Sequence, residues 1–149
     1  MILKTVPGVS ERIRSLEIQG ATNIAISAVK ALAQELRDFE GSKEEIGQVL
    51  TEAARMLVEA RATEPLMRNG LKYISSQLMA EDPSSRDSFK EVVTQLEGLV
   101  LEMYQGGRQR IMEIGAKRIR DGDIILTHCH SSAVTGALMF AHEQGKEFK

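Results

Sequence analysis

Apolar residues recur every three or four positions along most of the chain, which is the period of one face of an α-helix. The first predicted helix is short and spans residues 9–16, after a turn at Pro7-Gly8, and the second begins at an N-cap at Thr22. A third helix is predicted from the capping box Ser42–Glu45 to about Ala60, and a fourth from Pro65. A long fifth helix is predicted after residue 85, with a bend expected at Gly106-Gly107. The residues expected on the buried faces are Ile24, Ala28, Ala31, Leu32 and Leu36, then Ile46, Val49, Leu50, Ala53, Leu57 and Val58, then Leu66, Leu71, Ile74 and Leu78, and finally Phe89, Val92, Val93, Leu96, Leu99, Val100, Met103, Ile111, Ile114 and Ile119.

The pattern changes after residue 120. The sequence Asp121-Gly122-Asp123 predicts a turn, and residues 124–127 are a short apolar run typical of a buried, parallel strand. A further helix is predicted from Ala133 to His142, with Gly145 as the residue that ends it. The fold class is therefore mainly α, with a helical domain over residues 1–120 and the start of an incomplete α/β domain over 121–149. Because one strand cannot form a sheet, we expect either a fragment or pairing with another subunit.

The composition excludes several classes of protein. A net charge of −2 and an isoelectric point near 6.0 give no electrostatic footprint for nucleic acid. No apolar run approaches the ~20 residues that a membrane span needs. A single Cys allows no internal disulfide and fits a reducing compartment. We expect a soluble, cytoplasmic protein that contacts neither nucleic acid nor membrane.

Residues 127–132 carry the most informative side chains. In open α/β sheets, ligands lie beyond the carboxyl ends of strands, where the next helix begins. Ser131 and Ser132 suit a helix cap that binds phosphate, and Cys129 would lie near the same positive helix end, which favours the thiolate. Protonated His128 and His130 would reinforce that effect. Cys129 is therefore a candidate nucleophile or general acid/base, the alternative being a small core residue.

A metal site at His128-Cys129-His130 is disfavoured, because adjacent residues of a strand point to opposite faces. We expect neither a metal nor another cofactor. A second candidate phosphate site is the glycine turn at Gly20, directly before a helix, for which an ordinary helix–helix corner is the alternative. Arg61 suits bidentate phosphate binding, although such an Arg is often a C-terminal helix charge. The remaining basic group is expected on a solvated face: Arg108, Arg110, Lys117, Arg118 and Arg120.

The run from Gly115 to Ala133, with its Asp-Gly-Asp turn and Thr-His-Cys-His-Ser-Ser segment, resembles the centre of one protein family. Supporting stretches lie at residues 13–25, 59–63 and 141–146. The family joins archaeal ribose-1,5-bisphosphate isomerase, methylthioribose-1-phosphate isomerase and the regulatory subunits of translation initiation factor 2B. The resemblance implies a helical N-terminal domain, a Rossmann-like C-terminal domain that is truncated in this chain, and a sugar phosphate site between them.

The resemblance also implies roles for individual residues. Family isomerases convert an aldose 1-phosphate into a ketose with a Cys and an Asp, and that Cys corresponds to Cys129. The positions around the phosphates are Gln19, Gly20, Ala21, Arg61, His130, Ser131 and Ser132. The Asp belongs to the C-terminal domain beyond residue 149, so this chain alone is expected to be inactive. The implied partners are a sugar phosphate, further copies in a dimer or a hexamer of dimers, and, in a regulatory protein, initiation factor 2 subunits.

Two sequence differences leave alternatives open. Gln19-Gly20-Ala21 stands where the isomerases usually have Arg-Gly-Ala, and Arg61-Ala62 where they tend to have Arg-Pro. An amide in place of a guanidinium removes a charged, bidentate phosphate contact. Gln19 is similar to the initiation-factor-like members, whereas residues 128–131 are similar to the ribose-1,5-bisphosphate enzyme. The alternatives to an isomerase are a non-catalytic subunit related to initiation factor 2B and a helical assembly module.

Overall fold

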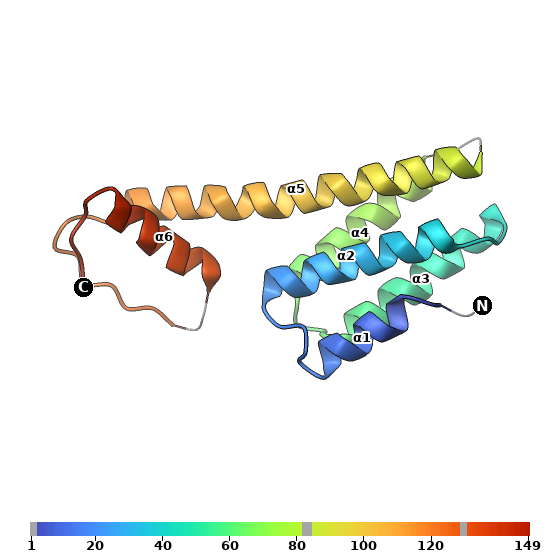
Figure 1. The fold of residues 1–149 in the computed structure, drawn as a ribbon, viewed down its shortest axis with the longest axis horizontal. Helices are drawn as coiled ribbons and strands as arrows, with labels where there is room; N and C mark the ends of the chain where they lie inside the picture. Colours follow the sequence, from blue (N-terminus) through green and yellow to red (C-terminus); the bar gives the residue numbers. More distant parts are fainter. Residues whose placement is uncertain (1–2, 82–84, 129–130) are drawn as a thin grey trace. The chain divides into compact units, whose positions relative to one another are not determined.

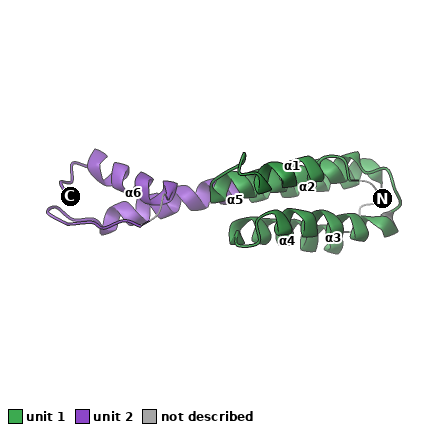
Figure 2. Cartoon of the chain, turned by 90° about the horizontal axis from the view of Figure 1, so that it is seen from below, with its two compact units in different colours: residues 1–101 green, residues 102–149 purple. Residues whose placement is uncertain are grey.

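The computed structural model describes residues 3–81, 85–128 and 131–149. Within these ranges the secondary structure is helical, with α1 (Val6–Arg14), α2 (Ala21–Asp38), α3 (Lys43–Ala60), α4 (Pro65–Ala80), α5 (Arg86–Arg118) and α6 (Ser132–Glu143), as Figure 1 shows. The chain forms two compact units, Met1–Leu101 and Glu102–Lys149 (Figure 2). The boundary expected after residue 120 remains a prediction. In the described ranges, no helix combines the length and the apolar character that crossing a membrane requires.

Helix α1 begins at Val6, earlier than predicted, so the expected turn at Pro7-Gly8 is wrong. Pro7 lies in the first helical turn, where its fixed φ suits the helix and its missing N–H would have had no intrahelical partner. Gly8 is likewise helical. The glycine and proline thus reflect a helix start here and not a break.

A buried carboxylate from α2 caps this helix start. Glu35, only 5% exposed, accepts hydrogen bonds from the backbone N–H groups of Lys4 (2.8 Å), Thr5 (2.8 Å) and Val6 (3.0 Å). The first turn of α1 contains no acidic residue, and Thr5 at the N-cap makes no side-chain capping bond. Glu35 therefore supplies from about 30 residues away the negative charge that favours a helix N-terminus.

The core of unit 1 confirms the predicted helical faces of α2, α3 and α4. Helix α2 packs against α1, α3 and α4. Fully or almost fully buried side chains are Ile24, Ala28, Leu32 and Leu36 of α2, Val49, Ala53 and Leu57 of α3, and Leu71, Ile74 and Leu78 of α4. The capping box of α3 is also confirmed, because the Ser42 N–H donates to the Glu45 carboxylate at 2.8 Å.

The N-terminus of α2 differs from the prediction at one point. The N-cap is Gly20 and the helix begins at Ala21, so Thr22 is not the cap. Gly20 has φ +84°, a left-handed conformation that a residue with a Cβ rarely adopts. The glycine therefore determines where the helix begins, ahead of the capping propensity of Thr22.

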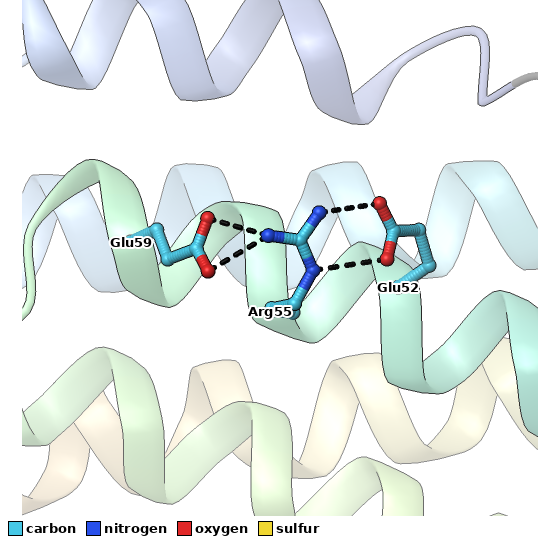
Figure 3. A network of polar contacts seen from close by, with 3 residues as sticks. All are labelled: Glu52, Arg55 and Glu59. Atoms are coloured by element: carbon cyan, nitrogen blue, oxygen red, sulfur yellow. Dashed lines mark hydrogen bonds and ion pairs between the residues drawn. The ribbon is translucent and has the colours of Figure 1, made fainter.

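An exposed network on α3 joins Glu52, Arg55 and Glu59 (Figure 3). Arg55 donates Nε and Nη2 to Glu52 at 3.0 and 2.6 Å, and Nη1 to both carboxylate oxygens of Glu59 at 2.7 and 2.6 Å. The hydrogen bonds from Arg55 lower the pKa of Glu52 below its ordinary value of 4.5. The two carboxylates in turn raise the pKa of Arg55.

Replacing Arg55 by Gln is expected to lower the thermal unfolding temperature slightly at neutral pH, because exposed ion pairs contribute little. A carboxyl whose pKa is lowered in the folded state stabilises the fold above its unfolded pKa. That contribution is lost as the pH falls through the lower, folded value. The difference between wild type and Arg55→Gln should therefore shrink below pH 4.5. Circular dichroism melts from pH 7 to 3 measure it, and a difference that grows on acidification would contradict the network.

Helix α5 continues through both glycines at 106 and 107 as one helix of 33 residues. In unit 1 its residues Phe89, Val93, Leu96 and Val100 are buried, as predicted. Arg37 of α2 also donates to Glu97 of α5 at 2.6 Å, in a half-buried ion pair. Val92 and Ile119 are partly buried. The prediction is wrong for four further residues, whose side chains are about half exposed: Leu99, Met103, Ile111 and Ile114. Helical spacing identifies a face, but burial also requires a segment that covers it.

In unit 2, α6 packs closely on the second half of α5 through small residues. A Cβ placed on Gly115 would lie 2.9 Å from the Cβ of Ala137, and one on Gly136 would meet the end of the Met112 side chain. Ala137 and Ala141 are buried at this contact. Lys146 adds a hydrogen bond from its Nζ to the carbonyl of Ala116, 2.7 Å away, near the C-terminal end of α5.

Gly115→Ala is expected to destabilise unit 2 by about 1–2 kcal/mol, because the Ala137 methyl group cannot move aside without its backbone. Gly106→Ala is the matched control: the site has no atom within 4 Å of an added Cβ, and alanine should stabilise the helix by about 0.5–1 kcal/mol. Amide hydrogen exchange of α6 measures the stability of unit 2 in both variants. Equal protection of α6 in the two variants would contradict the close contact.

The predicted strand at 124–127 is only partly supported. Lys149 donates its N–H to the carbonyl of Asp123 (2.9 Å) and accepts the N–H of Ile125 (2.7 Å), which is the bonding pattern of neighbouring parallel strands. No residue in the described ranges is nevertheless assigned to a strand. The expected burial is wrong, since Ile124 is 86% and Leu126 98% exposed. The pairing segment spans residues 147–149 alone, and no described segment covers these side chains. The helical part of the predicted fold is confirmed and the strand part is not.

Candidate functional site

The glycine turn before α2 presents free backbone donors. Gly20 offers no side chain to cap the helix, and the first turn contains no acidic residue. The N–H groups of the first turn therefore have no intrahelical acceptor, and they lie at the positive end of the helix dipole. Such a helix start attracts anions, which is the property that predicted phosphate binding at Gly20 and Ala21.

The side chain of Gln19 forms a hydrogen bond to the backbone of the turn that precedes α2. The side-chain Nε2 of Gln19 donates to the backbone carbonyl of Leu16 at 2.7 Å. The backbone carbonyl of Gln19 accepts a hydrogen bond from Asn23 Nδ2 at 3.1 Å. Leu16 itself has φ +63°, which is uncommon for a residue with a Cβ. The Gln19 amide thus stabilises the turn, and its role toward a phosphate remains a prediction.

Arg61 lies at the same end of unit 1 as the Gly20 turn. It is the C-cap of α3, with an exposed side chain. Helices α2 and α3 are packed together and joined by the short connection 39–42, so they run antiparallel and the start of α2 lies beside the end of α3 (Figure 1). The Gly20 turn before α2 and Arg61 after α3 therefore lie at the same end of unit 1.

The remaining predicted residues belong to unit 2. Ser131 is the N-cap of α6, as expected, and its Oγ accepts a hydrogen bond from the N–H of Val134 at 3.4 Å. Ser132 is the first residue of the helix. Cys129 and His130 lie outside the described residues, so their predicted roles stay predictions. His128 is exposed.

A groove of about 540 Å³ adjoins this helix start. It is lined by Ser131, Ser132 and Thr135 of α6 and by Arg108 and Met112 of α5. Its hydroxyl groups and guanidinium can donate to an anion, whereas the carboxylate of Glu143, which also lines the groove, would repel one. Met112, Met139 and Phe140 give it an apolar wall. Arg108 is exposed, as predicted, but its position beside this groove was not predicted. The four-residue spacing of Arg108 and Met112 marks a common helix face, but nothing in the sequence pairs that face with α6.

Metal coordination has no support from the described part of the chain, which contains no group of three or more His, Cys, Asp or Glu residues arranged to hold an ion. The donors at the two helix starts are N–H, hydroxyl and guanidinium groups. The N–H and guanidinium groups only donate, which suits an anion, and the hydroxyl groups can donate as well as accept. The chemistry of the described site residues therefore matches a phosphorylated ligand.

Two curated relatives named ribose 1,5-bisphosphate isomerase are similar to this chain. The protein from Pyrococcus furiosus is 34% identical over 100% of this chain and 47% of its own length. The protein from Thermococcus kodakarensis is 32% identical over 99% of this chain and 47% of its own length. The chain thus spans about half the length of the curated relatives it matches.

Two solved structures share the fold. The tetrameric eIF2B-beta2-delta2 complex from C. thermophilum contains a chain that matches with a TM-score of 0.82 and 20% identity, over 100% of this chain and 50% of that one. The 5-methylthioribose 1-phosphate isomerase from Pyrococcus horikoshii OT3 matches with a TM-score of 0.78 and 22% identity, over 96% of this chain and 42% of that one. The helical domain therefore has the fold found in both proteins.

The model of the initiation factor 2 subunit family matches residues 17–149, which include the Gly20 turn, Arg61 and the start of α6. The resemblance expected from residues 115–133 is thereby confirmed. This chain belongs to the initiation factor 2 subunit family.

Proposed function

We propose that this chain forms the N-terminal part of a sugar 1-phosphate isomerase that converts ribose 1,5-bisphosphate into the corresponding ketose. The observation that carries the proposal is the match of essentially the whole chain to relatives named ribose 1,5-bisphosphate isomerase, at 32–34% identity. The anion-binding character of both helix starts is consistent with a substrate that bears two phosphates.

Phosphate binding is assigned to the backbone N–H groups after Gly20, to Arg61 and to the hydroxyl groups of Ser131 and Ser132. The uncapped start of α2 supports the first assignment, and the exposed Arg61 beside it can donate two parallel hydrogen bonds to one phosphate. Ser131 accepts one backbone hydrogen bond with its oxygen and keeps its own O–H as a donor. These groups would orient the sugar without taking part in bond making.

Catalysis is assigned to the thiol of Cys129. The isomerisation moves the hydrogen of C2 to C1 while the bond from C1 to the ring oxygen breaks. The ring oxygen takes up a proton and the C2 hydroxyl loses one, so C2 is oxidised, C1 is reduced and no external oxidant is needed. Because C1 carries a phosphate, the ring cannot open as it does in a free sugar. The enzyme must therefore exchange protons at the anomeric centre, which is the role of a general acid/base. The second acid/base group, an Asp in the related isomerases, lies outside the described residues.

The test is an assay of the full-length gene product with ribose 1,5-bisphosphate. Formation of ribulose 1,5-bisphosphate, followed by phosphorus NMR, is the expected result. Absence of product from a protein that binds the substrate would remove the isomerase assignment. Binding is measured separately by calorimetry, so that failure to bind and failure to react are distinguished.

A second function is favoured by one observation. Gln19 bonds to the Leu16 carbonyl at the position where an isomerase would present a guanidinium to phosphate. This arrangement suits a non-catalytic regulatory subunit related to translation initiation factor 2B, which binds sugar phosphates or protein partners without turnover. Co-purification with an initiation factor 2 subunit, together with substrate binding and no product, would support this assignment over the first.

Assembly into a homo-oligomer accompanies either function in our proposal. The exposed apolar side chains of α5 and of residues 124–126 are the surfaces available for it. Multi-angle light scattering on the purified protein measures the mass directly. A monodisperse monomer at micromolar concentration would contradict this part of the proposal.

A further inference from the structure

The groove between α5 and α6 in unit 2 has an apolar middle and a charged residue at each end. Its volume is about 540 Å³. The apolar side chains that line it are Met112 of α5 and Met139 and Phe140 of α6, and the charged ones are Arg108 and Glu143. Met139 is 57% exposed, and both charged residues are exposed as well. The groove is therefore an open surface with apolar side chains and two charges of opposite sign.

The two charges lie at opposite ends because α5 and α6 run parallel (Figure 1). Met112 lies against Gly136, and Gly115 lies against Ala137, so residue numbers rise in the same direction along both helices. Arg108, one turn before Met112, therefore lies beside the start of α6.

The dipole of α6 has the same direction as these charges. Its start carries a positive partial charge, at the end where Arg108 lies, and Glu143 is its last residue, at the negative end. The two ends of this 12-residue helix are about 16 Å apart. Within the described part of the chain, neither Arg108 nor Glu143 has an ion-pair partner. Both charges are thus available to a partner.

We propose that this groove binds the same groove of a second copy of the chain, in an antiparallel arrangement around a two-fold axis. Such a contact places the positive end of each groove on the negative end of the other. Arg108 of each copy pairs with Glu143 of the other, and Met139 and Phe140 lie near the axis, where they are removed from water. Two antiparallel α6 helices also bring opposite dipole ends together.

A second copy is favoured over other partners because the charges of the groove are complementary to themselves. A groove lined by charges of one sign would repel its own copy, whereas here each end attracts the other. This surface is distinct from the exposed side chains of residues 124–126, and it does not depend on the isomerase assignment. Phosphate binding remains assigned to the hydroxyl groups of Ser131 and Ser132.

Charge reversal tests the arrangement on the full chain, by sedimentation velocity over a series of concentrations. Arg108→Glu and Glu143→Arg should each raise the dissociation constant of the homodimer about tenfold or more, because each creates two like-charge contacts. An equimolar mixture of the two variants should associate as tightly as wild type, because every charged contact between them joins opposite signs. Arg110→Glu is the matched control, since Arg110 is an exposed arginine of α5 outside the groove. It should associate like wild type.

Met139→Ser tests the apolar middle and should also weaken association about tenfold, because it removes apolar surface from the centre of the contact. A wild-type chain that stays monomeric at millimolar concentration would overturn the proposal. So would a mixture of Arg108→Glu and Glu143→Arg that associates no better than either variant alone. Equal weakening by Arg110→Glu and Arg108→Glu would indicate a general effect of net charge, and it would overturn the proposal too.

Discussion

Replacing Glu35 by alanine should lower the free energy of unfolding by about 3 kcal/mol. Glu35 is 5% exposed and is the acceptor for three backbone N–H groups at the start of α1, all within 3.0 Å. Removing it leaves those donors unpaired in a largely buried place and leaves the helix dipole without its negative charge. For a domain of this size the unfolding temperature should fall on the order of 15 °C. Thermal and urea unfolding followed by circular dichroism measure both quantities.

Two variants make the result specific. Glu35→Gln keeps one carbonyl oxygen as an acceptor and should cost about half as much as alanine, with the protein still folded. Glu91→Ala on α5 is the matched control, because Glu91 is an exposed helical glutamate without this role. If Glu35→Ala were no more destabilising than Glu91→Ala, the carboxylate would not be holding the start of α1.

Replacing Cys129 by serine in the full-length gene product should reduce turnover of ribose 1,5-bisphosphate about 10²–10⁴-fold, the usual contribution of a general acid/base. A hydroxyl is nearly the same size as a thiol but is far less acidic, so it cannot exchange protons at the anomeric centre near neutral pH. The expected change lies in kcat, while KM stays within a few fold because the proposed site binds the phosphates through other groups. Steady-state kinetics separate the two constants.

Ser132→Ala supplies the contrast, since Ser132 is assigned to phosphate binding and not to proton transfer. That variant should raise KM with a smaller effect on kcat. A Cys129→Ser protein with wild-type kcat would exclude the thiol as acid/base, even if the protein remains an isomerase. A loss confined to KM would instead place Cys129 among the binding groups.

The predictions from sequence succeeded where the determining interactions are local. Helical periodicity identifies α2, α3 and α4, and local capping or proline signals also identify where α3 and α4 begin. The predicted cap of α2 at Thr22 was wrong, because the helix begins one residue earlier, after Gly20. Ser42 with Glu45, and Ser131 before α6, are signals of this kind. The Pro7-Gly8 turn was wrong because the same dipeptide also fits a first helical turn.

Interactions between residues that are distant in the sequence could not be predicted from it. Glu35 is one of several glutamates in a helix, and nothing nearby in the sequence indicates that it binds the backbone at residues 4–6. That the exposed Arg108 lines a groove with Ser131 was not predicted for the same reason, because only the packing of α6 on α5 brings these two residues to one groove. The exposed Ile124 and Leu126 show the converse, an apolar pattern that no described neighbour covers.

The continuous α5 helix has one further consequence. From Gln105 to Ile111 every side chain is exposed, so this stretch of helix is maintained by its own backbone hydrogen bonds and gains almost nothing from packing. Two of its seven residues are glycines, each of which disfavours a helix by up to ~1 kcal/mol. Local unfolding should therefore be easier here than elsewhere in α5. In a limited digestion with trypsin, the first cuts should fall after Arg108 and Arg110.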